Sequence, residues 1–340
     1  MKKSIVKIIR LLPLVGLAML GLQGSGQQLP LYSQYVFNKF LINPATAGSD
    51  GFTSYNITAR EQWIGYTGAP RTYSVSYQTR VLKRKFRIKH NVFDNTVFVP
   101  KNEGKVGFGG YIFADRNGLI QKTGFQTSYS YHAWLADYTQ MSLGIGLSGY
   151  FYRINVNETS FESPDDPLLN NDLLRRGVFI PDVDFGIYIL NPMFDVGFSA
   201  LQLVGAAAKI GNSAYNNYWM SRHYYLFASY NLRVGEKGQL EPAALVKMSE
   251  QMRPQVDIGA NYIQNQAFWA GLTYRTDGAV IANIRFKVIP SRINMTSLFF
   301  GYAFDFTLNK IQRVTYGTHE FTLAVKFGDS AKRFRWLDRY

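Results

Sequence analysis

Large apolar residues alternate with smaller or more polar ones along most of this chain. In residues 320–327 every second position is apolar, namely Phe321, Leu323, Val325 and Phe327. The same alternation recurs upstream, at 298–306, 268–274, 256–262 and 143–147. A period of two places successive side chains on opposite faces of a β-strand, so each run predicts a strand with one apolar face.

The pattern predicts about fourteen strands spread over the chain. They lie near residues 53–63, 71–80, 105–114, 122–134, 139–152, 182–190, 193–200, 222–233, 239–249, 254–263, 266–276, 279–288, 295–306 and 318–327. Runs of about ten residues that are rich in Tyr and Phe are typical of strands that cross a membrane. Because a bilayer offers no partner to backbone groups, a sheet crosses it only as a closed barrel. We therefore expect an all-β fold, a transmembrane antiparallel β-barrel of the outer membrane with an even number of strands.

The N-terminus has the layout of a secretory signal peptide. Four basic residues within the first ten precede an apolar run at 11–22 and small residues at 24–26. This layout predicts a signal peptide at residues 1–26 that is cleaved before Gln27. The apolar run is too short for a membrane-spanning helix, and no later stretch reaches the roughly 18 apolar residues that such a helix needs.

Three further regions follow from these boundaries. Residues 27–52 form an N-terminal extended segment, residues 53–327 the transmembrane barrel, and residues 328–340 a basic, aromatic C-terminal tail. The tail has two interpretations. Its aromatic residues settle at the level of the lipid head groups, or the tail is a docking peptide.

The composition narrows the class of protein. Aromatic residues make up 16% of the 340 positions, with 23 Tyr and 25 Phe, which suits a membrane barrel better than a secreted β-sandwich. The absence of cysteine excludes disulfides, thiol catalysis, Cys-ligated metals and a lipid-modified Cys. The formal net charge of +14 fits contact with anionic lipid head groups or an acidic protein partner. Nucleic acid is not an expected partner, because an exported protein rarely meets any.

The motifs that could carry chemistry are weak. Gly144, Gly146 and Gly149 spell G-x-G-x-x-G, but they fall inside an alternating strand instead of at a strand-to-helix turn. We expect them to relieve crowding on the inner face or to permit a bend. The four histidines lack metal-ligand spacing. Ser130 and His132 share a strand face that is expected to point inward, away from the lipid that a barrel lipase must reach. We expect no enzyme activity and no cofactor.

Several blocks of sequence, in one order, resemble a known family. The blocks are LYSQYVFN at 31–38, LINPATAGS at 41–49, REQWIG at 60–65, GAPRT at 68–72, FWAGLTYR at 268–275, GYAFDF at 301–306 and GTHE at 317–320. Together they resemble the PorP/SprF family of type IX secretion and gliding-associated outer-membrane proteins, over residues 29 to 327. The basic tail after Phe327 is not part of this resemblance.

The resemblance implies a barrel in the outer membrane of a Bacteroidota-type bacterium, without known catalysis. Its implied partners are outer-membrane lipid, periplasmic lipoproteins or a peptidoglycan-binding protein of the type IX machinery, and in some members one secreted adhesin. We therefore expect a barrel that docks secretion components or supports the secretion or surface attachment of an adhesin. The alternative is an outer-membrane channel for a small solute, because the inward positions 144, 146, 148, 259 and 261 are small or polar.

The candidate site combines the N-terminal blocks and is interpreted as a motif for partner docking or for barrel closure. Its residues are Tyr35, Asn38, Asn43, Pro44, Ala45, Gly48, Arg60, Trp63, Gly68 and Pro70. Because the residue before a proline is held extended, the segment around Asn43 and Pro44 is expected to be ordered. Such a segment either fills the lumen or lies across its periplasmic mouth. Arg60 is expected in the lumen and Trp63 in the aromatic girdle.

Overall fold

The computed structural model describes residues 30, 32–81, 105–136, 138–154, 177–205, 207–209, 217–219, 221–250, 252–288 and 296–327. The predicted signal peptide at 1–26 and the predicted tail at 328–340 lie outside these residues. Three short 3₁₀ helices are described, η1 (Lys39–Leu41), η2 (Pro44–Thr46) and η4 (Lys310–Val314). No helix in this part of the chain has the length and apolar character needed to cross a membrane.

Strands account for most of the described residues. They are β1 (Thr53–Glu61), β2 (Arg71–Val81), β3 (Val106–Asn117), β4 (Ile120–Ala136), β5 (Thr139–Ile154), β6 (Val178–Leu190), β7 (Phe194–Leu201), β10 (His223–Tyr230), β11 (Leu232–Val234), β12 (Gly238–Ser249), β13 (Met252–Gln264), β14 (Phe268–Arg275), β15 (Ala279–Val288), β16 (Thr296–Thr307) and β17 (Thr318–Phe327). Two further short strands, β8 (Ala207–Lys209) and β9 (Asn217–Trp219), pair only with each other.

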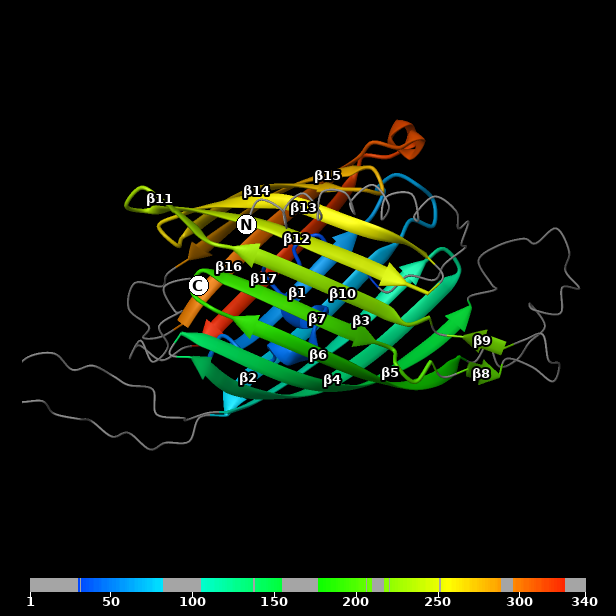
Figure 1. Ribbon diagram of the computed structural model, residues 1–340. Coiled ribbons are helices and arrows are strands. Elements are labelled where there is room, and N and C mark those ends of the chain that lie inside the picture. The colour runs from blue at the N-terminus through cyan, green and yellow to red at the C-terminus, as the bar shows by residue number, and fades with distance from the viewer. Residues whose placement is uncertain are drawn as a thin grey trace, which may run out of the picture.

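The long strands form one closed antiparallel barrel (Figure 1). Neighbours in sequence pair throughout, β1 pairs with β17, and β10 pairs with both β7 and β12. Strand β11 continues the line of β10 past Asn231 against the same neighbour β12, so fourteen strands encircle the barrel in the described part of the chain. Closure leaves no backbone edge for the bilayer, which confirms the predicted architecture.

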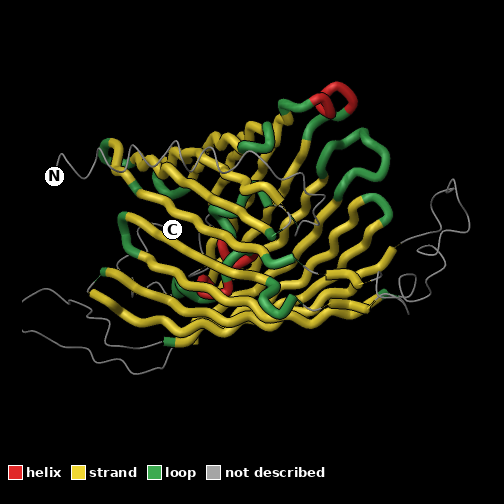
Figure 2. The backbone as a smooth tube through the Cα atoms, turned by 45° about the vertical axis from the view of Figure 1, so that its right-hand side comes forward, coloured by secondary structure: helices red, strands yellow, loops and turns green. Residues whose placement is uncertain are grey.

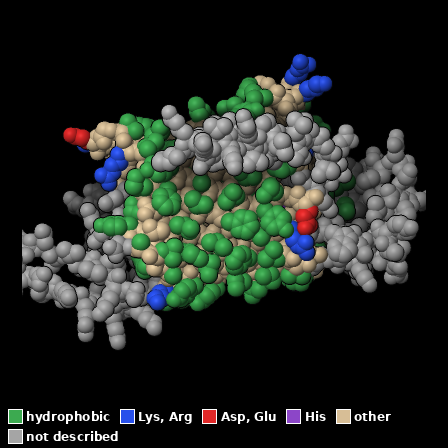
Figure 3. Space-filling model, in the orientation of Figure 1, with side chains coloured by type: hydrophobic (Ala, Val, Ile, Leu, Met, Phe, Trp, Pro, Cys, Tyr) green, Lys and Arg blue, Asp and Glu red, His purple; other side chains and the backbone are tan. Residues whose placement is uncertain are grey.

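The alternation of the sequence separates the two faces of the barrel wall. On β5, Leu143, Ile145 and Leu147 point outward and are 41%, 55% and 60% exposed, while Gly144 and Gly146 between them are buried inside. Figure 3 shows the result on the face in view, where apolar side chains cover the middle of the barrel and charged side chains gather toward its two ends. This distribution is the one that a bilayer selects, because charge on the lipid-facing surface is costly at the midplane.

The two rims of the barrel carry different connections. Because the number of strands is even, β1 begins and β17 ends at the same rim, here called the terminal rim. Other connections at the terminal rim are 82–105, 137–138, 191–193, 235–237, 265–267 and 289–295. The opposite rim, here called the loop rim, carries among others the connections 62–70, 155–177, 202–222 and 308–317.

Candidate functional site: a segment folded inside the barrel

A segment of the chain itself occupies the lumen. Residues 32–52, here called the plug, run inside the barrel before β1 begins, and η1 and η2 stand in red within the ring of strands in Figure 2. Phe40, Ala45 and Ala47 are at most 1% exposed, and the Phe40 ring packs edge-on against Tyr111 of β3. The plug is therefore part of the core of the barrel, and it does not lie across the mouth.

Asn43 both starts helix η2 and ties it to the wall. Its backbone is extended, its Oδ1 accepts a hydrogen bond from Ala45 N at 2.8 Å, and Pro44 takes the first helical position, where no N–H is needed. Its Nδ2 donates to the carbonyl oxygens of Ile187 on β6 and Phe198 on β7, at 3.0 and 3.1 Å. One side chain thus joins the plug to two neighbouring strands.

Truncation of this side chain is expected to destabilise the protein. Asn43→Ala removes the cap and leaves two wall carbonyls without their donor, so we expect the free energy of unfolding to fall by about 1–3 kcal/mol. Urea unfolding in lipid vesicles measures the change. The matched control is Asn117→Ala at the exposed end of β3, which should stay close to wild type. Equal stability of the two variants would show that the Asn43 contacts are not formed.

Glycines on the barrel wall make room for the plug. Five of them face plug atoms, namely Gly107, Gly109, Gly144, Gly186 and Gly301. A Cβ at Gly144 would meet the backbone of Ala45, and a Cβ at Gly109 would lie 2.5 Å from the Phe40 ring. The G-x-G-x-x-G stretch is thus divided between the two faces of β5: Gly144 and Gly146 point inward, whereas Gly149 lies outside against Phe125 and Phe179.

The start of the plug is held by buried charges near the loop rim. Arg60 of β1 pairs with Asp305 at 2.8 Å and with Glu320 at 3.0 Å. Glu320 in turn accepts the backbone N–H groups of Ser33 and Gln34, at 2.7 and 2.9 Å. Since both oxygens of Glu320 are used by the plug and Arg60, the carboxylate links the segment to β1 and β17.

The same network continues around the wall. Arg275 contacts Asp257 at 3.0 Å and Asp305 at 3.5 Å, and Lys247 contacts Asp257 at 3.0 Å. Together with Arg60 and Glu320, these side chains form a chain of three cations and three carboxylates of balanced charge. Such a balance is required where charges are withdrawn from water, because an unpaired charge there is strongly destabilising.

Toward the terminal rim, further pairs hold the other end of the plug. Lys39 of η1 binds Asp195 of β7 at 2.8 Å, and Asp50 binds Lys326 of β17 at 3.1 Å. The plug is thereby attached to the wall along its length.

Ser130 and His132 also hold the plug. Both are fully buried and point into the lumen, as their shared strand face predicts. The Ser130 hydroxyl donates to the Ala47 carbonyl at 2.6 Å, while His132 Nδ1 lies 2.7 Å from the Ser142 hydroxyl. Among the described residues, no group of three His, Asp or Glu side chains is arranged to hold a metal ion.

The structure divides the predicted site residues into two groups. Tyr35, Asn38, Asn43, Pro44, Ala45 and Gly48 all belong to the plug, and Arg60 lies in the lumen beside it. Asn38 donates to the Ser76 hydroxyl at 3.1 Å. Gly48 needs to be glycine, because its φ is +65° and a Cβ would lie 2.5 Å from the Thr79 carbonyl oxygen.

Trp63, Gly68 and Pro70 are not brought to the plug. They belong to the connection 62–70 at the loop rim, where they order the turn through backbone groups. Trp63 N donates to the Thr318 hydroxyl at 3.2 Å, and the Gly68 carbonyl accepts from Gly118 N at 3.0 Å. Sequence reasoning grouped these residues with the plug because their blocks are adjacent in the chain.

Other residues that form or contact the plug are not among the predicted site residues. Phe40 and Lys39 fill the lumen, and the five wall glycines receive the plug. The sequence pattern could have indicated the glycines. Several of them stand at inward positions of alternating strands, where a side chain is otherwise expected to fill the lumen.

The sequence matches one protein family. The family is described as Type IX secretion system membrane protein PorP/SprF, and the match covers residues 24–325. No curated protein matches the chain.

Several solved structures share the fold at very low identity. The toluene transporter TodX of P. putida has a TM-score of 0.46 at 7% identity, covering 85% of this chain and 93% of its own. A FadL homologue of Pseudomonas aeruginosa scores 0.44 at 10% identity, with 89% and 96% covered. The Acinetobacter baumannii outer membrane protein Omp33 scores 0.38 at 8% identity, with 82% and 100% covered. At these scores the likenesses say nothing about function.

Proposed function

Because the chain belongs to the PorP/SprF family of type IX secretion system membrane proteins, we propose that it is a non-enzymatic docking barrel of the outer membrane. It binds periplasmic secretion components, supports the secretion or surface attachment of one cognate adhesin, or does both. The observation that carries this proposal is the plug. A lumen filled by the chain's own residues leaves the two rims as the surfaces on which a partner binds.

The terminal rim is the surface that we assign to periplasmic partners. Bacterial barrels place short turns in the periplasm and longer loops outside the cell, and the turns 191–193, 235–237 and 265–267 lie at this rim. The connection 82–105 is the long exception, and it carries five basic residues within 83–89. A basic connection suits an acidic periplasmic partner.

The loop rim exposes apolar side chains on two connections that hydrogen-bond to each other. Ile64 N donates to the Gly317 carbonyl at 2.9 Å, and Tyr316 N donates to the Ile64 carbonyl at 2.8 Å. Tyr66, Val314 and Tyr316 on these connections are 53%, 60% and 79% exposed. Exposed apolar side chains on an ordered surface favour contact with another protein, which supports the adhesin branch of the proposal.

A solute channel is the alternative, and it requires the plug to leave the lumen. The hydrogen bonds of the plug with β1, β4, β6, β7 and β17 oppose this movement. Conductance in a planar bilayer separates the two functions, since a plugged barrel is silent and a porin opens in steps.

The proposal is tested by a crosslinked affinity purification of the tagged protein from outer membranes, with the bound proteins identified by mass spectrometry. We expect periplasmic lipoproteins, a peptidoglycan-binding protein or one large secreted adhesin to be enriched. An unrelated tagged barrel from the same membranes is the control. Recovery of general porins alone, at the level of the control, would contradict the docking role.

A further inference from the structure

Three arginines stand in one row on the outer face of the barrel at the loop rim, here called the arginine row. Arg71 is the first residue of β2 and lies directly opposite Arg116 of β3 in the antiparallel register. The row continues through Gln121 of β4, which is opposite Arg116, to Arg153 of β5, which is opposite Gln121. Each of these residues lies within two positions of the loop-rim end of its strand, so the row follows the edge of the wall.

The arginine row stands where the apolar outer surface of the barrel ends. Arg71, Arg116 and Arg153 are exposed and alternate with buried, inward-facing residues of their strands. Two positions further into the strands, the outward neighbours are Tyr73 of β2 and Phe151 of β5, which are 47% and 54% exposed. Aromatic residues in a membrane barrel mark the boundary of the hydrocarbon region, so the arginine row lies at the level of the lipid head groups.

Two like charges face each other at the start of this row. Residues directly opposite on one face of an antiparallel pair have Cβ atoms about 5 Å apart, and like charges in this arrangement are destabilising. At the loop-rim ends of β10 and β12 the charges are opposite, and Arg222 pairs with Glu250 at 3.0 Å. Between β2 and β3, arginine faces arginine. An anion held between Arg71 and Arg116 removes this repulsion.

The carboxylate next to the row does not neutralise it. Glu61 of β1 lies opposite Arg71, but their nearest charged atoms are 3.9 Å apart. The same carboxylate accepts a hydrogen bond from the Tyr73 hydroxyl at 3.0 Å. With Glu61 included, three guanidinium groups face one carboxylate, so the row keeps a positive net charge.

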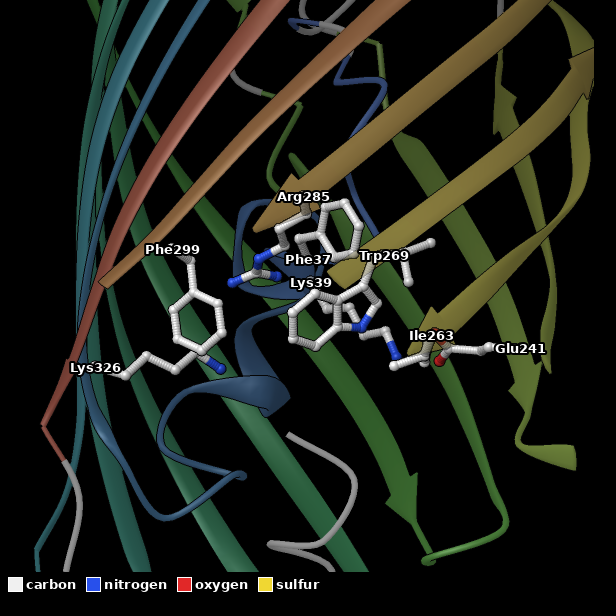
Figure 4. Close-up of a pocket in the computed structure, with 9 residues that line it drawn as sticks. Phe37, Lys39, Glu241, Ile263, Trp269, Arg285, Phe299 and Lys326 are labelled. Carbon is white, nitrogen blue, oxygen red and sulfur yellow. The ribbon is translucent and has the colours of Figure 1, made fainter. Parts of the chain in front are cut away.

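The cations inside the barrel are arranged differently. Lys39 and Lys326 pair with Asp195 and Asp50, respectively. Arg285 of β15 is enclosed by the aromatic rings that surround it in Figure 4. These cations are held by the protein's own side chains, away from the surface. The arginine row lies on the surface instead, and its guanidinium groups face the molecules that surround the barrel.

The backbone that carries Arg71 and Arg116 is ordered. The connection 62–70 leads directly into Arg71, and the carbonyl of Gly68 in this connection accepts a hydrogen bond from Gly118 N at 3.0 Å. Gly118 follows Arg116 by two residues. Because both arginines start from fixed positions, the entropy lost when they bind one anion together is reduced.

We propose that the arginine row binds a phosphate group of lipopolysaccharide, the anionic glycolipid of the outer leaflet. The phosphate accepts hydrogen bonds from Arg71 and Arg116, because the planar fork of donors on a guanidinium matches phosphate oxygens. Arg153 adds a third positive charge, and the acyl chains of the same lipid pack against the apolar surface beside Tyr73 and Phe151. The proposal uses the orientation assigned above, in which the loop rim faces outward from the cell, and it is independent of the docking role.

Native mass spectrometry of the purified full chain in detergent tests this site. The probes are lipid A with its phosphates, which is the membrane anchor of lipopolysaccharide, the same lipid A after removal of the phosphates, and inorganic phosphate. We expect saturable binding of the phosphorylated lipid A. The double variant Arg71→Gln and Arg116→Gln should lose at least roughly tenfold in affinity.

A second double variant is the matched control. Lys310→Gln and Arg313→Gln remove the same charge from exposed positions on the connection that contains η4, at the same rim but outside the row, and should bind like wild type. Arg71→Lys and Arg116→Lys together keep the charge without the planar fork and should bind at an intermediate level.

Four results would overturn the proposal. Lipid A binds equally with and without its phosphates, the glutamine variant of the row binds like wild type, the control variant loses as much affinity as the row variant, or inorganic phosphate binds while lipid A does not. Crosslinked purification of the row variant separates this failure from that of the docking role. Unchanged partner recovery with lost lipid A binding supports the proposal. Lost partner recovery with unchanged lipid A binding assigns the row to a protein partner instead.

Discussion

A variant that lacks residues 32–47 is expected to conduct ions in a planar bilayer where the full chain is silent. These residues carry η1, η2 and most of the plug. The wall residues that face them include three glycines, Gly107, Gly144 and Gly186. Without the plug, no wall side chain replaces Ala45 or Phe40. Barrels of eight strands are filled by their own side chains and those of sixteen enclose an aqueous channel, so a barrel of fourteen strands is wide enough to need a plug.

A smaller change should act in the same direction. Gly144→Leu places a side chain where the backbone of Ala45 lies, so the plug is displaced while the barrel itself keeps its strands. Ala228→Leu is the matched control, because it adds the same side chain on the lipid face of β10. We expect stepwise openings for the deletion and for Gly144→Leu, and none for the control. Silent traces from a folded deletion variant would show that the plug does not close the barrel.

Arg60→Ala is expected to cost about 3–5 kcal/mol of the free energy of unfolding. Asp305 and Glu320 are at most 2% exposed, and the substitution leaves these two carboxylates without their shared cation. Arg275 compensates only in part, since it lies 3.5 Å from Asp305. Urea unfolding in lipid vesicles measures the loss.

The control for this loss is Arg71→Ala on the adjacent strand β2. Its side chain is 60% exposed and 3.9 Å from Glu61, so the expected change is about 0–1 kcal/mol. Arg60→Lys should recover part of the stability, because the charge remains. If Arg60→Ala and Arg71→Ala unfolded alike, the buried network would not be what anchors Ser33 and Gln34.

The barrel was predictable because its signal is local. Alternation at each strand needs only the residues of that strand, and the predicted runs correspond to the fourteen strands of the ring. The boundaries were less accurate. The predicted strand at 182–190 lies wholly after Pro181, yet β6 begins at Val178. Because β7 pairs only with residues 185–190 of β6, the missing N–H of Pro181 interrupts no bond on that side.

The position of the plug was only partly predictable. Asn43 and Pro44 indicate an ordered segment, but nothing near them in sequence distinguishes the lumen from the mouth. The distinction depends on Gly144, Gly186 and Glu320, which reach the plug from β5, β6 and β17 only after the ring has closed. For the same reason, Trp63 could not be separated from the plug, because adjacency in the chain does not report which rim a connection lies on.

The most direct test of the account is whether the plug sits in the lumen in the membrane. The chain has no cysteine, so introduced thiols report without background. A Cβ at Gly186 would lie 3.0 Å from Asn43 Cγ. In Asn43→Cys the sulfur takes the place of Asn43 Cγ. The pair Asn43→Cys and Gly186→Cys is therefore placed to form a disulfide. Pairing Asn43→Cys with Asn283→Cys, on the opposite side of the ring, is the control. The account predicts that the first pair crosslinks in outer membranes and the control does not. Free thiols in both pairs, open to a membrane-impermeant maleimide, would contradict it.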